Sequence, residues 1–205
     1  MYVVIAEDTS DFNCLKILIK RLENKEAISV EGKGFGSCGN MMNKGAKFLS
    51  SYNEQNKYRK LIICHDRDES SYQGIYEKIV LKIVNNAKIK SEKLICILIP
   101  TKEIEAWILA DIKAVSKVIP SWQPKDEYLH PEDIKDPKET LIRLSRANRP
   151  KPLYSHNTHN EQIMKHIDLG KIKEKCPSFA ELAKFVESGT ANYPKRNSLT
   201  INQPN

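Results

Sequence analysis

The chain of 205 residues lacks any apolar run long enough to cross a bilayer, which takes about 20 residues. It also lacks a recognisable secretory signal, because the apolar start at residues 1–6 is too short and leads directly into acidic residues. Its five cysteines are odd in number and form no Cys-x-x-Cys pair, which argues against a disulfide framework. We therefore expect a reduced, cytoplasmic protein made of one domain, or of one domain with an appendage.

Acidic residues are in the minority, with 26 Asp and Glu against 33 Lys and Arg, for a formal net charge of +7. A basic surface favours a polyanion such as DNA or RNA through phosphate contacts and counterion release. A lysine-rich proteome of low GC content explains the same excess equally well. Charge alone therefore leaves nucleic-acid binding open.

Short β-branched strands alternate with amphipathic helices in the first half of the chain. We expect strands at 2–6, 27–30, 60–64 and 93–99, and helices at 11–24, 40–52 and 72–86. Ser10 or Asp11 is the expected N-cap of the first helix, and the four glycines within 32–39 predict a flexible loop. This alternation predicts an α/β fold, in which a parallel sheet is flanked by helices.

After Pro100 the strands stop and the pattern becomes helical. Helices are expected at 102–110, with 112–118 as a continuation, and at 138–147, 157–167 and 178–188; residues 121–138 are loop-like. We expect a catalytic core at 1–111, a helical extension packed on it at 112–188, and a disordered tail at 189–205.

Acidic residues directly follow two of the expected strands. Glu7 follows the first, and Asp66 and Asp68 follow the third. In an open parallel sheet, ligands bind beyond the carboxyl ends of the strands, so these acids face one crevice. Asp66 and Asp68, two residues apart in an extended segment, point the same way. Oxygen ligands of this kind hold Mg²⁺ or Mn²⁺, although acids are also common at ordinary strand ends. Phosphatases of the haloacid-dehalogenase type carry Asp-x-Asp after the first strand, which argues against that class here.

A third acidic segment begins where the fourth strand ends. Glu103 and Glu105 lie on different faces of the expected helix, so only one of them points toward the site. An acid in the first turn of a helix is also favourable by itself, which is the simpler explanation.

These segments carry a resemblance to a known group of enzymes. Residues 7–11, Glu-Asp-Thr-Ser-Asp, are similar to the Glu-Gly-x-Thr-Glu opening of Toprim-related nucleases of the OLD (overcoming lysogenisation defect) type. Residues 65–68, His-Asp-Arg-Asp, resemble their Asp-x-Asp motif. Residues 105–111, Glu-Ala-Trp-Ile-Leu-Ala-Asp, resemble the Glu-Ala-Trp-Leu-Leu-Ala-Asp signature of a small Toprim-like bacterial family of unassigned function, which Cys-Pro-Ser-Phe at 176–179 also fits. The resemblance spans residues 1–188.

The resemblance implies a Toprim-like fold and a Mg²⁺-dependent endonuclease that hydrolyses phosphodiester bonds of DNA or RNA. It implies four catalytic acids, all of them also metal ligands, and one further metal ligand: Glu7, Asp66, Asp68 and Glu105, with Asp11 as the fifth. Such proteins work beside a separate ATPase subunit in antiviral defence, so a partner is implied as well. Asp8 departs from the family glycine, and an acid there is expected to crowd the turn or alter metal binding.

Basic residues near these motifs and in a later run are the expected contacts to nucleic-acid phosphates. They are Arg67, Lys102, Arg143, Arg146, Arg149 and Lys151. For the run from Arg143 onward, a solvated helix end is the alternative. Two other functions also stay open: a non-catalytic module that binds nucleic acid or an ATPase partner, and a phosphotransferase or phosphatase acting on small nucleotides. The histidines at 156, 159 and 166 match no zinc spacing.

Overall fold

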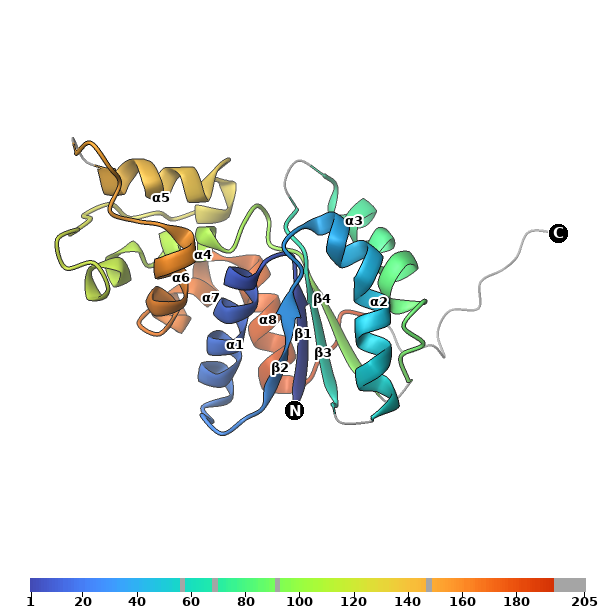
Figure 1. Ribbon diagram of the computed structural model, residues 1–205. Helices are drawn as coiled ribbons and strands as arrows, with labels where there is room; N and C mark the ends of the chain where they lie inside the picture. The colour runs from blue at the N-terminus through green and yellow to red at the C-terminus, as the bar shows by residue number, and fades with distance from the viewer. Residues whose placement is uncertain (56–57, 68–69, 91–92, 147–148, 194–205) are drawn as a thin grey trace.

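The computed structural model describes residues 1–55, 58–67, 70–90, 93–146 and 149–193. Four parallel strands form one sheet in the order β2-β1-β3-β4 (Figure 1). The strands are β1 (Tyr2–Ala6), β2 (Val30–Gly34), β3 (Lys60–Cys64) and β4 (Leu94–Leu98). The expected α/β class and the parallel sheet flanked by helices are confirmed, and the arrangement is consistent with a Toprim-like fold.

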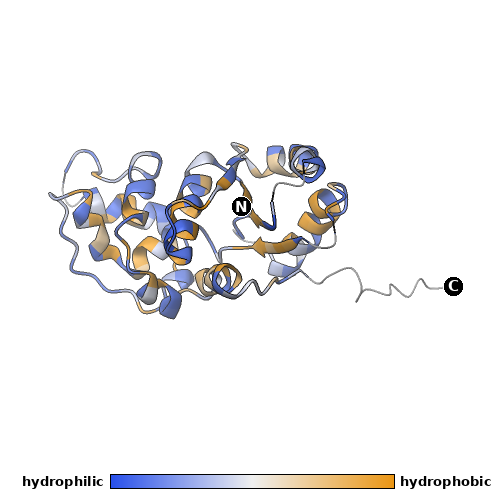
Figure 2. Cartoon of the chain, turned by 90° about the horizontal axis from the view of Figure 1, so that it is seen from below, coloured by the Kyte–Doolittle hydropathy of each residue, from blue (hydrophilic) through white to orange (hydrophobic). Residues whose placement is uncertain are grey.

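Helices cover both faces of the sheet because successive strand residues point to opposite sides. Val3 and Ile5 of β1 pack with α2 (Cys38–Glu54) and α3 (Tyr72–Ile79), and a π-helical turn, η1 (Val80–Val84), continues α3. Val4 of β1 packs on the other face with α1 (Thr9–Glu23) and α8 (Pro177–Ser188). Figure 2 shows hydrophobic segments gathered between these layers.

The remaining helices extend the core on the α1 side of the sheet. They are α4 (Glu105–Ala110), the 3₁₀ turns η2 (Ile112–Lys117) and η3 (Pro131–Asp133), α5 (Pro137–Arg146), α6 (His156–Met164) and α7 (Leu169–Lys175). Trp107 of α4 is fully buried, and its Nε1 donates to Ser178 Oγ of α8 at 2.9 Å. Leu141 and Ile163 belong to the same apolar cluster as Val4. The helices after residue 111 therefore share one core with the sheet.

The second strand is placed differently from the expectation. It spans Val30–Gly34 instead of 27–30, so part of the expected flexible loop is a strand. A Cβ on Gly32, whose φ is +135°, would lie 1.7 Å from the carbonyl oxygen of Val4, and one on Gly34 would lie 2.0 Å from the carbonyl carbon of Asp8. These glycines therefore allow the backbone of β2 to approach its neighbours, which is a common reason for glycine within a strand.

Several element boundaries also differ. Helix α1 begins at Thr9 and is capped by Asp8 rather than by Ser10 or Asp11, because Asp8 Oδ1 accepts the Asp11 N–H at 2.8 Å. Asp8, where the resembled family has glycine, thus stabilises the start of the helix. Helix α7 and the turn η3 were not expected.

The open edge of β4 is covered by the first residues of the expected tail. Asn192 accepts the N–H of Ile97 at 2.8 Å and donates to its carbonyl oxygen at 2.7 Å, as a neighbouring strand would. Residues 189–193 are thus placed on the sheet, whereas 194–205 lie outside the described residues. Among the described helices, none combines the length and the apolar character needed to cross a membrane.

Candidate functional site at the carboxyl ends of the strands

Four of the five expected acids meet beyond the carboxyl ends of the strands. Glu7 follows β1 and Asp66 lies two residues after β3, and Glu7 Oε1 accepts the Asp66 N–H at 3.0 Å. Asp11 comes from the first turn of α1, and Glu105 from the first residue of α4. Charge interactions among all four are strong enough to shift pKa values. The fifth acid, Asp68, lies outside the described residues.

Asp66 holds the most unusual atom of this cluster. Its Oδ1 is buried and has no hydrogen-bond partner among the described residues. Burial, followed by the charges of Asp11, Glu7 and Glu105, raises the pKa of Asp66 well above its ordinary value. An unpaired buried carboxylate oxygen costs free energy, because it has given up water without gaining a donor. A bound cation would remove that cost.

The pKa values of Asp11 and Glu105 are raised as well, in both cases mainly by burial. Burial, then the charges of Asp8 and Glu105, raise the pKa of Asp11 from 3.8 to about 8. Burial raises the pKa of Glu105 from 4.5 to about 6, although the positive charge of Lys138 lowers it. Without a cation, the site therefore keeps protons near neutral pH.

Glu105, not Glu103, is the acid of the α4 segment that faces this cluster. Glu105 is 2% exposed, and its Oε1 accepts a hydrogen bond from the buried Asn160 Nδ2 of α6 at 3.1 Å. Glu103 accepts from the backbone N–H of Lys138 at 3.0 Å and from its Nζ at 3.1 Å. Lys138 Nζ also lies 3.9 Å from Glu105 Oε1. Helix α5 thus places the positively charged amino group of Lys138 beside the acids.

His65 joins the acids to a cysteine. Its Nδ1 lies 2.9 Å from Glu7 Oε1 and 2.6 Å from the carbonyl oxygen of Asp66, and its Nε2 lies 3.1 Å from Cys38 Sγ. Burial lowers the pKa of His65, but the hydrogen bond and charge of Glu7 raise it by more. In the described part of the chain, Glu7, Cys38 and His65 are the one group of three such residues whose ligand atoms lie within 4.8 Å of one another.

Sequence reasoning missed several residues of this site. His65 stands directly before Asp66, and this position beyond β3 was the available signal. Cys38, Lys138 and Asn160 gave no comparable signal, because they are distant in sequence from every acidic motif.

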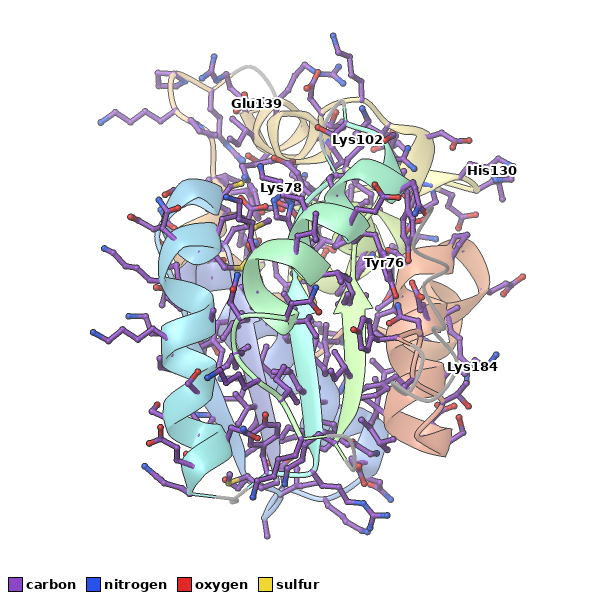
Figure 3. All side chains as sticks on the ribbon, turned by 90° about the vertical axis from the view of Figure 1, so that its right-hand side faces the viewer. Tyr76, Lys78, Lys102, His130, Glu139 and Lys184 are labelled. Carbon is purple, nitrogen blue, oxygen red and sulfur yellow. The ribbon has the colours of Figure 1, made fainter. Side chains whose placement is uncertain are left out.

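The expected basic residues divide into two groups. Arg67 is close to the acids, and its N–H donates to the carbonyl oxygen of Pro100 at 3.1 Å, next to the segment that carries Lys102. Figure 3 shows Lys78 and Lys102 on the side of the molecule toward which the strands point. The second group is exposed and begins on α5: Arg143, Arg146, Arg149 and Lys151. At a rise of 1.5 Å per residue, Arg146 lies roughly 12 Å along the helix from Lys138.

The donor chemistry of the acid cluster fits a hard divalent cation. Carboxylate oxygens are the ligands of Mg²⁺ and Mn²⁺, and the unpaired oxygen of Asp66 offers one directly. Among the described residues, no three of these acids bring their carboxylate oxygens within 4.8 Å of one another, as the ligand atoms of Glu7, Cys38 and His65 do. Wide spacing suits Mg²⁺, which keeps several of its waters and contacts few carboxylates directly.

One comparison with known proteins identifies the family of this chain, and none of the comparisons indicates its chemistry. Residues 6–187 match the family described as Domain of unknown function (DUF4276). Neither the curated proteins nor the solved structures contain a match. Because the matched region covers most of the chain, from the end of β1 to nearly the end of α8, the protein belongs to the DUF4276 family.

Proposed function

We propose that this protein is a Mg²⁺- or Mn²⁺-dependent endonuclease that hydrolyses phosphodiester bonds of DNA or RNA. The observation that carries the proposal is the buried, unpaired Oδ1 of Asp66, whose pKa is raised by burial and by the charges of Asp11, Glu7 and Glu105. Such a cluster destabilises the metal-free protein, so it is expected at a site where the working protein binds a cation. The resemblance to Toprim-related nucleases supports the same assignment and adds Asp68.

Glu7, Asp11, Asp66 and Glu105 are the described residues that would hold the cation. When bound, a divalent cation neutralises the scissile phosphate and lowers the pKa of an attacking water. Glu7 is oriented by the Asp66 N–H and by His65, which positions its carboxylate to bind the metal or to accept the proton of that water. Asn160 fixes Glu105, so the acid on α4 does not turn away from the site.

Basic residues beside the acids favour a phosphate-containing substrate. Lys138 Nζ lies 3.9 Å from Glu105 Oε1, Arg67 directly follows Asp66, and the net charge of +7 includes all the acids of the site. Phosphate contacts of this kind position a nucleic acid without reading its sequence. We further propose a place in antiviral defence beside a separate ATPase subunit, which rests on the resemblance alone. None of the five cysteines is joined in a disulfide, which favours the reduced cytoplasm as its location.

Cleavage assays with purified protein test the proposal. Supercoiled DNA, linear DNA and single-stranded RNA are incubated with Mg²⁺, Mn²⁺ or EDTA. We expect metal-dependent cleavage that Asp66→Asn lowers by roughly 10²–10⁴-fold, the usual contribution of a positioned catalytic group. Asp126→Asn is the matched control, because Asp126 is exposed in the segment between η2 and η3.

The alternatives give different results in the same assay. Metal-independent binding of nucleic acid without any cleavage would favour the non-catalytic module. Hydrolysis of mononucleotides but not of polymers would favour the small-nucleotide enzyme. Crystals soaked in Mn²⁺ give a separate check, because a well-ordered ion elsewhere and none near Glu7 and Asp66 would contradict the proposed site.

A further inference from the structure

A second set of donors lies beside the acids and differs from them in chemistry. Cys38 is the first residue of α2, His65 follows β3, and Glu7 follows β1. A thiol, an imidazole and a carboxylate are together typical ligands of Zn²⁺, whereas Mg²⁺ avoids sulfur. All three residues follow or begin regular elements of the sheet and its covering helix, so the scaffold holds their backbones in place.

The hydrogen bonds of His65 leave one ring nitrogen available to a metal. The carbonyl oxygen of Asp66 can only accept, so His65 Nδ1, at 2.6 Å, carries a proton. In the neutral ring, the lone pair is then on Nε2, which faces Cys38 Sγ at 3.1 Å. Metal-binding histidines usually have this arrangement, in which the other ring N–H donates to a carbonyl or carboxylate.

The distances are close to those of a tetrahedral zinc site. Zn–S bonds of about 2.3 Å and Zn–N bonds of about 2.0 Å place neighbouring ligand atoms roughly 3.5 Å apart. Cys38 Sγ and His65 Nε2 are 3.1 Å apart, and the Glu7 carboxylate lies within 4.8 Å of the other ligand atoms. In the metal-free protein, Glu7 Oε1 lies 2.9 Å from His65 Nδ1, so the Glu7 carboxylate must turn toward Nε2 before one ion contacts all three residues, with a fourth position for water.

We propose that Glu7, Cys38 and His65 bind a thiophilic divalent cation of the Zn²⁺ type, at a site that shares Glu7 with the acid cluster. Cys38 is the one cysteine of the five that is partly exposed, so an ion reaches it from solvent. On binding, the thiol proton leaves to solvent and the thiolate becomes the ligand. The site does not depend on the proposed nuclease activity.

Cobalt is the probe for this site, because Co²⁺ replaces Zn²⁺ and a cobalt–thiolate bond absorbs in the near ultraviolet. The full-length protein is titrated with Co²⁺ in the absence of Mg²⁺ and nucleic acid. We expect a sulfur-to-cobalt charge-transfer band that saturates at one equivalent and disappears when Zn²⁺ is added. Cys38→Ser should lose the band, while far-UV circular dichroism shows that the fold is retained.

Two further variants complete the experiment. His65→Gln should weaken Co²⁺ binding by more than the roughly 10–100-fold that follows loss of an outer-shell partner. His130→Ala is the matched control and should change nothing, because His130 is exposed and projects from the molecule (Figure 3). Absence of the band in the wild-type protein, or a band that persists in Cys38→Ser, would overturn the proposal. Since no substrate is present, either result leaves the proposed nuclease activity to its own test.

Discussion

Glu105→Gln tests the electrostatic cost of the acid cluster directly. Glu105 is 2% exposed, and burial raises its pKa from 4.5 to about 6. Glutamine has nearly the same shape and keeps an oxygen that accepts the hydrogen bond from Asn160. The substitution therefore removes the charge while the packing is retained.

The magnitude follows from the pKa. A carboxyl whose pKa is raised by folding binds its proton more tightly in the folded state, so stability falls as pH rises from 4.5 to about 6 and is constant above. At pH 7, the ionised Glu105 therefore costs the folded state about 2 kcal/mol. Glu105→Gln should raise the free energy of unfolding by about that amount, which corresponds to a Tm increase of roughly 4–8 °C for a chain of this size. Well below pH 4.5, Glu105 is protonated in both the folded and the unfolded protein, so the gain in Tm from Glu105→Gln should vanish.

Thermal unfolding in metal-free buffer at pH 7 and at pH 4 measures this effect. Glu103→Gln is the control of opposite sign, because it removes an ion pair with Lys138 and should destabilise by up to about 1 kcal/mol. Added Mg²⁺ should raise the Tm of the wild-type protein by more than it raises the Tm of the Glu105→Gln variant. A lower Tm of Glu105→Gln at pH 7, or an equal increase at pH 4, would refute the electrostatic argument. Full nuclease activity in this variant would show that Glu105 only begins a helix.

Other predictions concern the surface and the sheet. Replacing Arg143, Arg146 and Arg149 with Gln should weaken nucleic-acid binding for all sequences and lower the salt-dependence slope by roughly 0.7–0.9 per lost phosphate contact. Binding is measured over a salt series with Ca²⁺ in place of Mg²⁺. An unchanged slope would show that this run of arginines is only a solvated helix end. Gly34→Ala should lower the Tm, because the added Cβ would lie 2.0 Å from the Asp8 backbone. Gly39→Ala is the control: its Cβ would have nothing within 4 Å, so it should be neutral or stabilise α2 by up to about 1 kcal/mol. An equal Tm for both variants would contradict the packing argument.

The sequence by itself determined the fold class and the general place of the acid cluster. Alternating strands and helices are local patterns of period 2 and 3.6, and they are written in neighbouring residues. Once the strands are parallel, their carboxyl ends share one edge, so Glu7 after β1 and Asp66 after β3 must lie close together. The position after β4 likewise predicted an acid of this segment at the same edge. The spacing did not distinguish Glu105 from Glu103, and only the family resemblance favoured Glu105.

Tertiary structure alone decided the details that depend on contacts between distant segments. Glu105 faces the acids because Asn160 holds it and because Lys138 binds Glu103, and both partners lie more than 30 residues away in the chain. The contact between Cys38 and His65 also depends on the fold, because the two residues lie 27 positions apart in the sequence. Strand β2 was misplaced for the same reason, since its glycines are required by the backbone of β1 and by the turn that follows it. The raised pKa values of the acids also arise only on folding, because burial and mutual repulsion are absent from the extended chain.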